Sequence, residues 1–331
     1  MLKFSEEKLL QEFRTGLGLK EQIEGMIDAI CETGYSSVLY VGIGGTILAA
    51  GQVFKMAKQL GARLPLFLEN AADLVAEGHP FLDDQSLVII ASASGDTKEV
   101  VAAVDYAHEK GARVLGYVEK PGTPLAEKCD DLILSPCGET LFFYTVTLRL
   151  LKNAGFFPDY DRFYQELEKL PEALVGVAKQ ADPAMEELAG RLWNENLTYV
   201  IGSGLLEDWA TCYGMCIMEE MQWMRTRPVS CANFFHGTLE VIDRDTPVLL
   251  FIGEDKTRAE AQRVERFVET VSAKVNVIDT QEYALGDMDP AFRPLLSPFI
   301  ASIVCRRLSV YLERERRHPM AIRRYYRRLE Y

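Results

Sequence analysis

Short, uninterrupted apolar runs alternate with segments of helical spacing along the first half of the chain. The apolar runs lie at 37–41, 64–68, 86–91, 114–118 and 132–134, and helix-like segments follow at 46–60 and between 97 and 111. Strands that are apolar throughout, without alternation, are typical of a parallel sheet covered by helices on both faces. We therefore expect residues 1–158 to form an N-terminal helix and a doubly wound α/β module.

A second series of the same kind follows a stretch of helical spacing at 159–192. Pro171 and Pro183 interrupt that stretch, where we expect a linker helix region. The predicted strands beyond it are 198–201, 248–252 and 275–278, with predicted helices around 209–224 and at 258–270. The pattern predicts a second parallel sheet flanked by helices over 193–314, and a basic C-terminal tail over 315–331.

Both modules open with similar residues. The sequence Leu-Tyr-Val-Gly-Ile-Gly at 39–44 resembles Thr-Tyr-Val-Ile-Gly-Ser-Gly at 198–204 in composition and in position within its module. This short match hints at an internal duplication with a period far longer than that of a solenoid repeat.

Composition and charge narrow the class of protein. Of the 331 residues, 48% are hydrophobic and 26% are charged, as in an average globular protein. The formal net charge of −13 opposes binding to nucleic acid or to an anionic membrane, so we expect neither as a partner. Arginines nevertheless crowd the end of the chain, between Arg314 and Arg328. Given the overall charge, a solvated or subunit-contacting tail is favoured there over a nucleic-acid site.

The cysteines and the N-terminus favour a cytoplasmic protein without a metal. The seven cysteines are widely spaced, form no CxxC pair and are expected to be reduced. Cys212 and Cys216 could share a helix face, but a metal site needs further ligands and the chain has only four histidines. The first residues are charged and amphipathic, unlike a signal peptide.

A glycine turn, Gly42-Ile43-Gly44-Gly45, follows the first predicted strand and opens a helix. Such a turn lets the backbone approach a ligand while the helix N-terminus faces it. The turn lacks the GxGxxG and GxxxxGK[ST] patterns, which argues against a dinucleotide or a nucleoside triphosphate but leaves a sugar phosphate possible. A plain structural junction between strand and helix is the alternative.

A run of hydroxyl residues follows the strand at 86–91. Ser92, Ser94 and Thr97, in the sequence Ser-Ala-Ser-Gly-Asp-Thr, lie at a strand's carboxyl end and directly before a helix. Hydroxyls and free backbone N–H groups at such a place can surround a phosphate without any lysine. An ordinary N-cap at Ser94 or Asp96 is the alternative, but it explains only one or two of these residues.

Glu220 and His236 form a third candidate constellation. Glu220 lies on a predicted helix, and His236 precedes Gly237 sixteen positions later. A carboxylate base and an imidazole acid suit a proton relay near neutral pH. A solvated helix position for Glu220 and an N-terminal helix residue for His236 are the alternatives that the residues alone leave open.

Together these residues resemble the sugar isomerase (SIS) family, in which two such modules bind and isomerise phosphosugars. Residues 92–97 match that family's S-x-S-G-x-T phosphate loop, and Glu220 with His236-Gly237 is similar to the isomerase half of glucosamine-6-phosphate synthase. The resemblance implies that Ser92, Ser94 and Thr97 bind the phosphate and that Gly44, Gly45 and Thr46 line the sugar. It also implies that Glu220 moves a proton between C1 and C2 while His236 assists ring opening.

The end of the chain narrows the resemblance further. Residues 318–326, with the closing Leu-Glu-Tyr, resemble the tail of the deglycases that cleave fructoselysine or fructose-asparagine phosphates. Ala232-Asn233-Phe234 departs from the family's Gly-Glu-Phe, and the synthase's tail lysine and glutamine-hydrolysing domain have no counterpart.

The resemblance implies a deglycase that hydrolyses a ketosamine 6-phosphate to an aldose 6-phosphate and a free amine or amino acid. It implies no cofactor, no metal, and a homodimer or higher homo-oligomer with the site between subunits. An aldose–ketose isomerase, an amino-sugar phosphate deaminase and a noncatalytic sugar-phosphate sensor are the alternatives.

Overall fold

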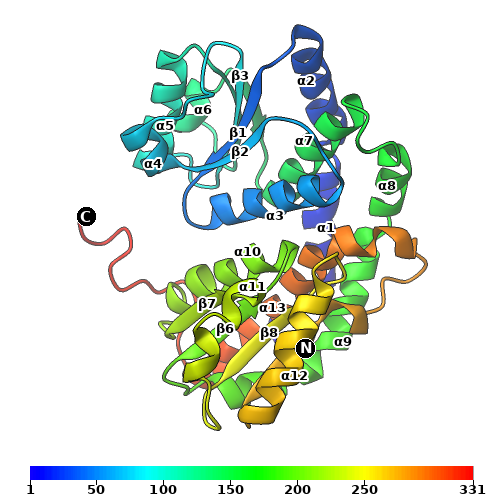
Figure 1. Ribbon diagram of the computed structural model, residues 1–331, viewed down its shortest axis with the longest axis vertical. Coiled ribbons are helices and arrows are strands. Elements are labelled where there is room, and N and C mark those ends of the chain that lie inside the picture. The colour runs from blue at the N-terminus through cyan, green and yellow to red at the C-terminus, as the bar shows by residue number, and fades with distance from the viewer. Residues whose placement is uncertain (331) are drawn as a thin grey trace. The chain divides into compact units, whose positions relative to one another are not determined.

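The computed structural model describes residues 1–330, so the last residue of the predicted tail, Tyr331, lies outside the described residues. The chain divides into two compact units (Figure 1). Glu7–Pro171 forms the N-terminal unit, and Met1–Glu6 joins the chain from Glu172 onward in the C-terminal unit. The boundary falls in the first turn of helix α9 (Leu170–Leu192), inside the region predicted as a linker.

The N-terminal unit is built on a five-stranded parallel sheet in the order β2-β1-β3-β4-β5. The strands are β1 (Ser37–Gly42), β2 (Leu66–Asn70), β3 (Ser86–Ser92), β4 (Arg113–Val118) and β5 (Asp131–Leu134). Every residue of β1 and β3 is buried, which explains why these strands read as continuous apolar runs.

Helices cover both faces of this sheet, as Figure 1 shows. The helices are α1 (Glu6–Leu17), α2 (Lys20–Thr33), α3 (Gly45–Gln59), α4 (Ala71–Glu77), α5 (Lys98–Glu109), α6 (Pro124–Lys128), α7 (Glu139–Asn153) and α8 (Tyr160–Leu167). Helices α4, α5 and α6 pack with the sheet around Val88, Ile90 and Val104. Helix α2 packs against α7, where Arg149 Nε donates a hydrogen bond to Asp28 Oδ1 at 2.7 Å.

The C-terminal unit is built on a four-stranded parallel sheet in the order β7-β6-β8-β9. The strands are β6 (Thr198–Gly202), β7 (Thr226–Ser230), β8 (Val248–Ile252) and β9 (Val275–Asp279). Its helices, besides α9, are α10 (Leu205–Cys212), the π-helix η1 (Tyr213–Glu219), α11 (Cys231–Phe234), α12 (Arg258–Val271) and α13 (Arg293–Arg316), with short 3₁₀ turns at Thr238–Val241, Thr280–Glu282 and Pro290–Phe292. These sheets and helices confirm the predicted fold class.

Helix α13 belongs to the core of the C-terminal unit. Its length and composition would suffice to cross a membrane, but 83% of its most apolar window is buried inside the protein, as in the core helix of a globular domain. Arg307 on α13 pairs with Asp182 on α9 at 2.8 Å, and Tyr311 Oη donates to the same carboxylate at 2.9 Å. The buried charges are therefore paired where the two helices meet.

The two units share one local design. In each, the first strand lies between the second and third, and a glycine ends the following turn at the N-cap of a helix. Gly44 has φ 62° and ψ −128°, and Gly204 has φ 54° and ψ −127°. These angles lie in a region that favours glycine, so the match supports the predicted internal duplication.

Candidate functional site

The predicted phosphate loop lies at the carboxyl edge of the N-terminal sheet. Ser92 ends β3 and is buried, and its Oγ accepts a hydrogen bond from Gly95 N at 3.0 Å. Gly95 has φ +69°, and a Cβ there would come within 2.2 Å of Thr123 Oγ1. The loop therefore packs tightly against Thr123, the N-cap of α6, and requires glycine at this position.

Thr97 is the N-cap of α5, in place of Ser94 or Asp96. Its backbone is extended, with φ −65° and ψ 118°, but its hydroxyl makes no capping hydrogen bond. The hydroxyl and the first amides of α5 can consequently bind an anion. The alternative interpretation of residues 92–97 as an ordinary cap does not explain the Thr97 hydroxyl.

The glycine turn lies at the same edge, because β1 and β3 are neighbours and Val41 pairs with Ile90. A Cβ at Gly42 would come within 2.8 Å of Thr46 Oγ1, so the first turn of α3 sits close over the end of β1. Thr46 Oγ1 donates to Ile43 O at 3.0 Å and accepts from Ile43 N at 3.3 Å. Its hydroxyl thus stabilises the turn, while Gly44 and Gly45 begin the helix.

Two acidic residues at this edge escaped the sequence analysis. Glu119 directly follows β4, and Glu139 is the first residue of α7, after β5. Burial, with a smaller contribution from the charge of Glu119, raises the pKa of Glu139 to about 7. The sequence feature that could have indicated Glu139 is the preceding Gly138, which has φ +112° and lies directly before a helical segment.

The corresponding edge of the C-terminal sheet holds a carboxylate of its own. Asp255 follows β8, and its Oδ2 accepts from Leu205 N at 2.8 Å, at the start of α10. Its Oδ1 accepts from Thr257 N at 2.8 Å and from Thr257 Oγ1 at 2.6 Å. A Cβ at Gly204 would come within 2.2 Å of Asp255 Oδ2. The aspartate therefore occupies the N-terminus of α10, and its charge opposes the binding of an anion there.

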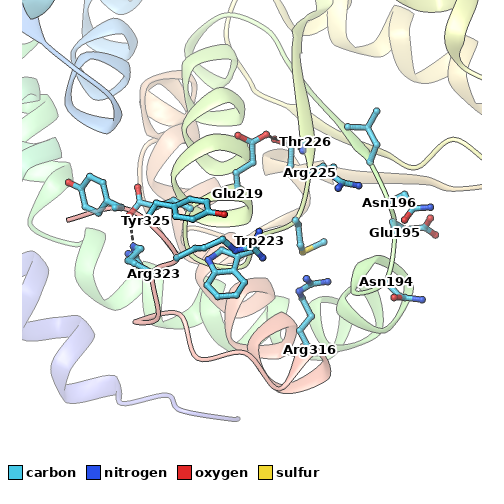
Figure 2. A pocket seen from close by; sticks show the side chains of 15 residues that line it. Asn194, Glu195, Asn196, Glu219, Trp223, Arg225, Thr226, Arg316, Arg323 and Tyr325 are labelled. Carbon is cyan, nitrogen blue, oxygen red and sulfur yellow. Dashed lines mark hydrogen bonds and ion pairs between the residues drawn. The ribbon is translucent and has the colours of Figure 1, made fainter. Parts of the chain in front are cut away.

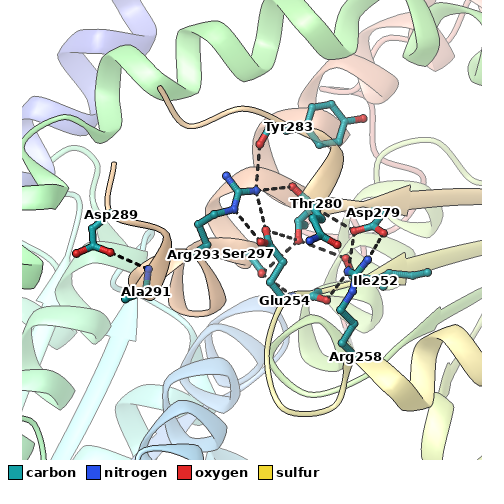
Figure 3. A network of polar contacts seen from close by, with 12 residues as sticks. Ile252, Glu254, Arg258, Asp279, Thr280, Tyr283, Asp289, Ala291, Arg293 and Ser297 are labelled. Atoms are coloured by element: carbon teal, nitrogen blue, oxygen red, sulfur yellow. Dashed lines mark hydrogen bonds and ion pairs between the residues drawn. The ribbon is translucent and has the colours of Figure 1, made fainter. Parts of the chain in front are cut away.

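A polar network surrounds that edge, as Figure 3 shows. Glu254 accepts two hydrogen bonds from Arg293, at 2.7 and 2.8 Å, and Arg258 pairs with Asp279 at the end of β9. Arg293 also donates to the carbonyl oxygens of Thr280 and Tyr283. At this edge of the second sheet the carboxylates of Glu254 and Asp279 are therefore each paired with an arginine of the same unit.

Glu220 lies at the opposite, amino-terminal edge of the second sheet. It is the C-cap of η1, and the neighbouring Glu219 accepts from Thr226 N at 3.0 Å, at the first residue of β7. Arg323 of the tail donates through Nε to Glu220 Oε1 at 2.8 Å. Glu220 is 32% exposed, so the carboxylate is held by the tail but remains accessible.

His236 lies beyond the other end of β7. It follows α11, which begins directly after Ser230, and its side chain is exposed. A strand of five residues spans roughly 13 Å at about 3.3 Å per residue. The structure therefore places Glu220 and His236 on opposite edges of one sheet and does not bring them together within one C-terminal unit.

A pocket of about 860 Å³ opens beside Glu220, entirely within the C-terminal unit (Figure 2). Its lining comes from the loop before β6, the end of η1 with the following turn, the end of α13 and the tail. The charged and aromatic lining residues are Glu195, Glu219, Glu220, Trp223, Arg225, Arg316, Arg323, Arg324, Tyr325 and Tyr326. The tail and the end of η1 both line the pocket because Arg323 of the tail pairs with Glu220.

Comparisons with known proteins relate the chain to a protein family, to bacterial deglycases and to a solved structure. Residues 35–152 match the SIS domain family. The chain is 29% identical to the fructosamine deglycase FrlB of Bacillus subtilis over 80% of this chain and 83% of the relative. It is 23% identical to the fructoselysine 6-phosphate deglycase of Escherichia coli over 92% of this chain and 89% of the relative. A crystal structure of a proposed phosphosugar isomerase from Bacillus subtilis superposes with a TM-score of 0.90 at 24% identity, covering 96% of this chain and 99% of the other.

Proposed function

The chain carries a SIS domain and is related to bacterial deglycases over most of its length, and from this we propose that it is a ketosamine 6-phosphate deglycase. The substrate is a sugar 6-phosphate whose C1 carries an amine. The products are an aldose 6-phosphate and the free amine or amino acid.

The observation that carries this proposal is the hydroxyl loop at the carboxyl edge of the N-terminal sheet. Thr97 caps α5 without using its hydroxyl, and Ser92 and Ser94 lie on the same tight turn. This arrangement suits a phosphate dianion in a protein with a net charge of −13, because the donors are hydroxyls and helix amides. The corresponding loop of the other unit holds Asp255, so the N-terminal unit binds the phosphate.

The chemistry needs one base that works at C1. Glu220 removes a proton from C1 of the open-chain ketosamine, and the electrons move into the C2 carbonyl to give an enaminol. Protonation at C2 then yields the imine of the aldose. Water adds to C1, the C1–N bond breaks, and the amine leaves with a proton. One water is consumed, and no net oxidation or reduction occurs.

His236 assists ring opening in this proposal, and it comes from a second copy of the chain. This proposal is supported by the positions of Glu220 and His236, which lie at opposite ends of β7 and therefore do not meet within one C-terminal unit. A symmetric homodimer can bring the Glu220 edge of one copy to the His236 edge of the other. Each site would then use both subunits.

Release of glucose 6-phosphate from a panel of ketosamine 6-phosphates tests the function. We expect turnover of at least one member and a loss of about 10²–10⁴-fold in Glu220→Gln, the range for one general acid–base residue. Glu240→Gln, an exposed substitution of the same kind, should retain full activity. No release from any member, with sugar phosphates still bound, would contradict the deglycase proposal and favour an isomerase or a sensor.

A further inference from the structure

The pocket beside Glu220 holds more positive charge than its acidic residues balance. Its four arginines are Arg225, Arg316, Arg323 and Arg324. Arg323 pairs with Glu220, whereas no carboxylate partner of the other three lies among the described residues. The lining also holds three glutamates, so its formal charge is 4 − 3 = +1, in a protein whose net charge is −13.

The acidic residues of the pocket are already engaged. Glu195 pairs with Lys274 at 2.8 Å, and Glu219 accepts from the amide and the hydroxyl of Thr226. Glu220 is the residue that pairs with Arg323. None of these carboxylates pairs with Arg225, Arg316 or Arg324. Arg316 donates to two backbone carbonyl oxygens, so the guanidinium groups of Arg225 and Arg324 are the ones open to an anion from outside the chain.

Two of these arginines are held in place by the protein. Arg316 donates through Nε to Gln222 O at 3.2 Å and also hydrogen-bonds to Trp193 O, and burial lowers the pKa of its guanidinium. Arg324 lies over the Trp223 ring, 4.3 Å from its centroid, and the His318 ring is tilted against the same ring, with 4.2 Å between the centroids. Trp223 has φ +54°, a backbone region that favours glycine, so the chain holds this ring in a strained place.

We propose that this pocket binds the carboxylate of the amino-acid part of the substrate. The inference rests on the proposed function, because Glu220 works at C1 and C1 carries the nitrogen of the amine. The amine substituent therefore extends from Glu220 into the space beside it. Guanidinium groups bind carboxylates through paired, charge-assisted hydrogen bonds, and a pocket of about 860 Å³ is ample for an amino acid.

The substrate class follows from this chemistry. The chain takes ketosamines formed from amino acids in preference to those formed from amines without a carboxylate. Trp223, Tyr325 and Tyr326 contribute apolar surface for the rest of the amino acid. The guanidinium groups also repel a cationic amine substituent that lacks a compensating carboxylate.

Two synthetic substrates that differ only in the carboxylate provide the test: the fructosamine 6-phosphates of glycine and of methylamine. We expect the wild-type kcat/KM to favour the glycine compound by roughly 10- to 100-fold, as for a charged hydrogen-bonded pair. Arg324→Gln and Arg225→Gln should lower kcat/KM for the glycine compound and leave that for the methylamine compound nearly unchanged. Both side chains are exposed, so neither substitution threatens folding.

Arg328→Gln is the matched control, because it removes the same charge from the same tail outside the pocket. Equal kcat/KM values for the two compounds, or a preference that survives both pocket substitutions, would overturn the inference. Calorimetric binding of the two compounds separates this inference from the proposed function. A carboxylate preference in binding that Arg324→Gln abolishes supports the pocket even where neither compound is turned over.

Discussion

Arg323 Nε lies 2.8 Å from Glu220 Oε1, although the two residues are 103 positions apart in the chain. The same guanidinium donates to the carbonyl oxygens of Met320 and Ile322, so it is fixed within the tail before it reaches the carboxylate. The tail therefore holds the carboxylate of the proposed base, and residues 323–326 of the tail line the pocket beside it in the same chain.

Arg323→Gln should lower kcat by about 10-fold with little change in KM, because the carboxylate loses the group that orients it but the phosphate loop is intact. Arg323→Lys should recover part of the loss, since a positive charge returns without the fixed geometry. Steady-state kinetics measures both effects, with Arg328→Gln as the control. A change confined to KM would argue against an orienting role.

A mixture of two inactive variants should regain activity if the site is shared between copies. Glu220→Gln and His236→Ala are each expected to be nearly inactive alone. Random mixing of the two in a homodimer gives one intact site in half of the dimers, so about a quarter of the wild-type activity should return. Activity no higher than the sum of the separate variants would place Glu220 and His236 in one copy or remove His236 from the reaction.

Thr97→Val should separate ligand binding from helix capping. The Thr97 hydroxyl makes no capping hydrogen bond, so its loss should change the free energy of unfolding by less than about 0.5 kcal/mol. Affinity for a sugar phosphate should fall by roughly 10-fold, as one hydrogen bond to a charged group is lost. Urea unfolding and calorimetric titration measure the two quantities. A large loss of stability with unchanged affinity would show instead that the Thr97 hydroxyl supports the helix and does not bind the phosphate.

Asp255→Ala should destabilise the protein by about 1–2 kcal/mol, the usual effect of removing a capping side chain. The substitution leaves the amide of Leu205 and the Thr257 hydroxyl without their acceptor. Asp245→Ala, at an exposed loop position before β8, is the control and should change stability much less. Chemical denaturation of the two variants side by side gives the comparison.

Glu139 should make stability depend on pH. Its pKa is about 7 in the folded protein and about 4.5 in an ordinary environment, so the folded state keeps a proton that the unfolded chain has lost between these values. The stability that protonated Glu139 contributes to the folded state is fully present below about pH 4.5 and is lost as the pH rises toward 7 and above. The free energy of unfolding should fall by at most about 3 kcal/mol across this window, since each pKa unit of difference between the folded and unfolded states corresponds to about 1.4 kcal/mol.

Glu139→Gln removes the titrating group and should flatten that dependence, with a gain in stability at pH 8 relative to the wild type. Glu99→Gln, an exposed change in the first turn of α5, should leave the slope unaltered. Urea unfolding at several pH values between 5 and 8 distinguishes the two. A wild-type stability that rises through this range would contradict the assignment to Glu139.

Sequence patterns predicted the sheets well where the strands are buried on both faces. Strands β1, β3 and β8 are buried along their whole length and mostly apolar, and so their runs are visible in the chain. Strand β7 was missed because its residues are Thr-Arg-Pro-Val-Ser, a composition suited to an edge strand, where Pro228 need not donate to a neighbour. The predicted helix at 209–224 is α10 followed by η1, because the hydrogen bonds widen to a π-helix from Tyr213.

The candidate site was only partly visible in the sequence. Hydroxyls and glycines that follow a strand directly are local features, and residues 92–97 and 42–45 lie where this pattern predicts. The contact of Arg323 with Glu220 and the hydrogen bond from Leu205 to Asp255 depend on segments far apart in the chain. No local spacing indicates which of the tail's arginines reaches the carboxylate.

The Asp255 carboxylate stabilises the start of α10 as a bound anion would, but it is covalently part of the protein. A molecule that binds only the folded state stabilises it in proportion to the logarithm of its concentration, but a tethered carboxylate does so at every concentration. The start of α10 thus needs no ligand from solution, whereas in the proposed function the loop at 92–97 takes up the phosphate of the substrate. We expect sugar phosphates to bind with a stoichiometry of one per chain and to protect the amides of α5, but not those of α10, from hydrogen exchange.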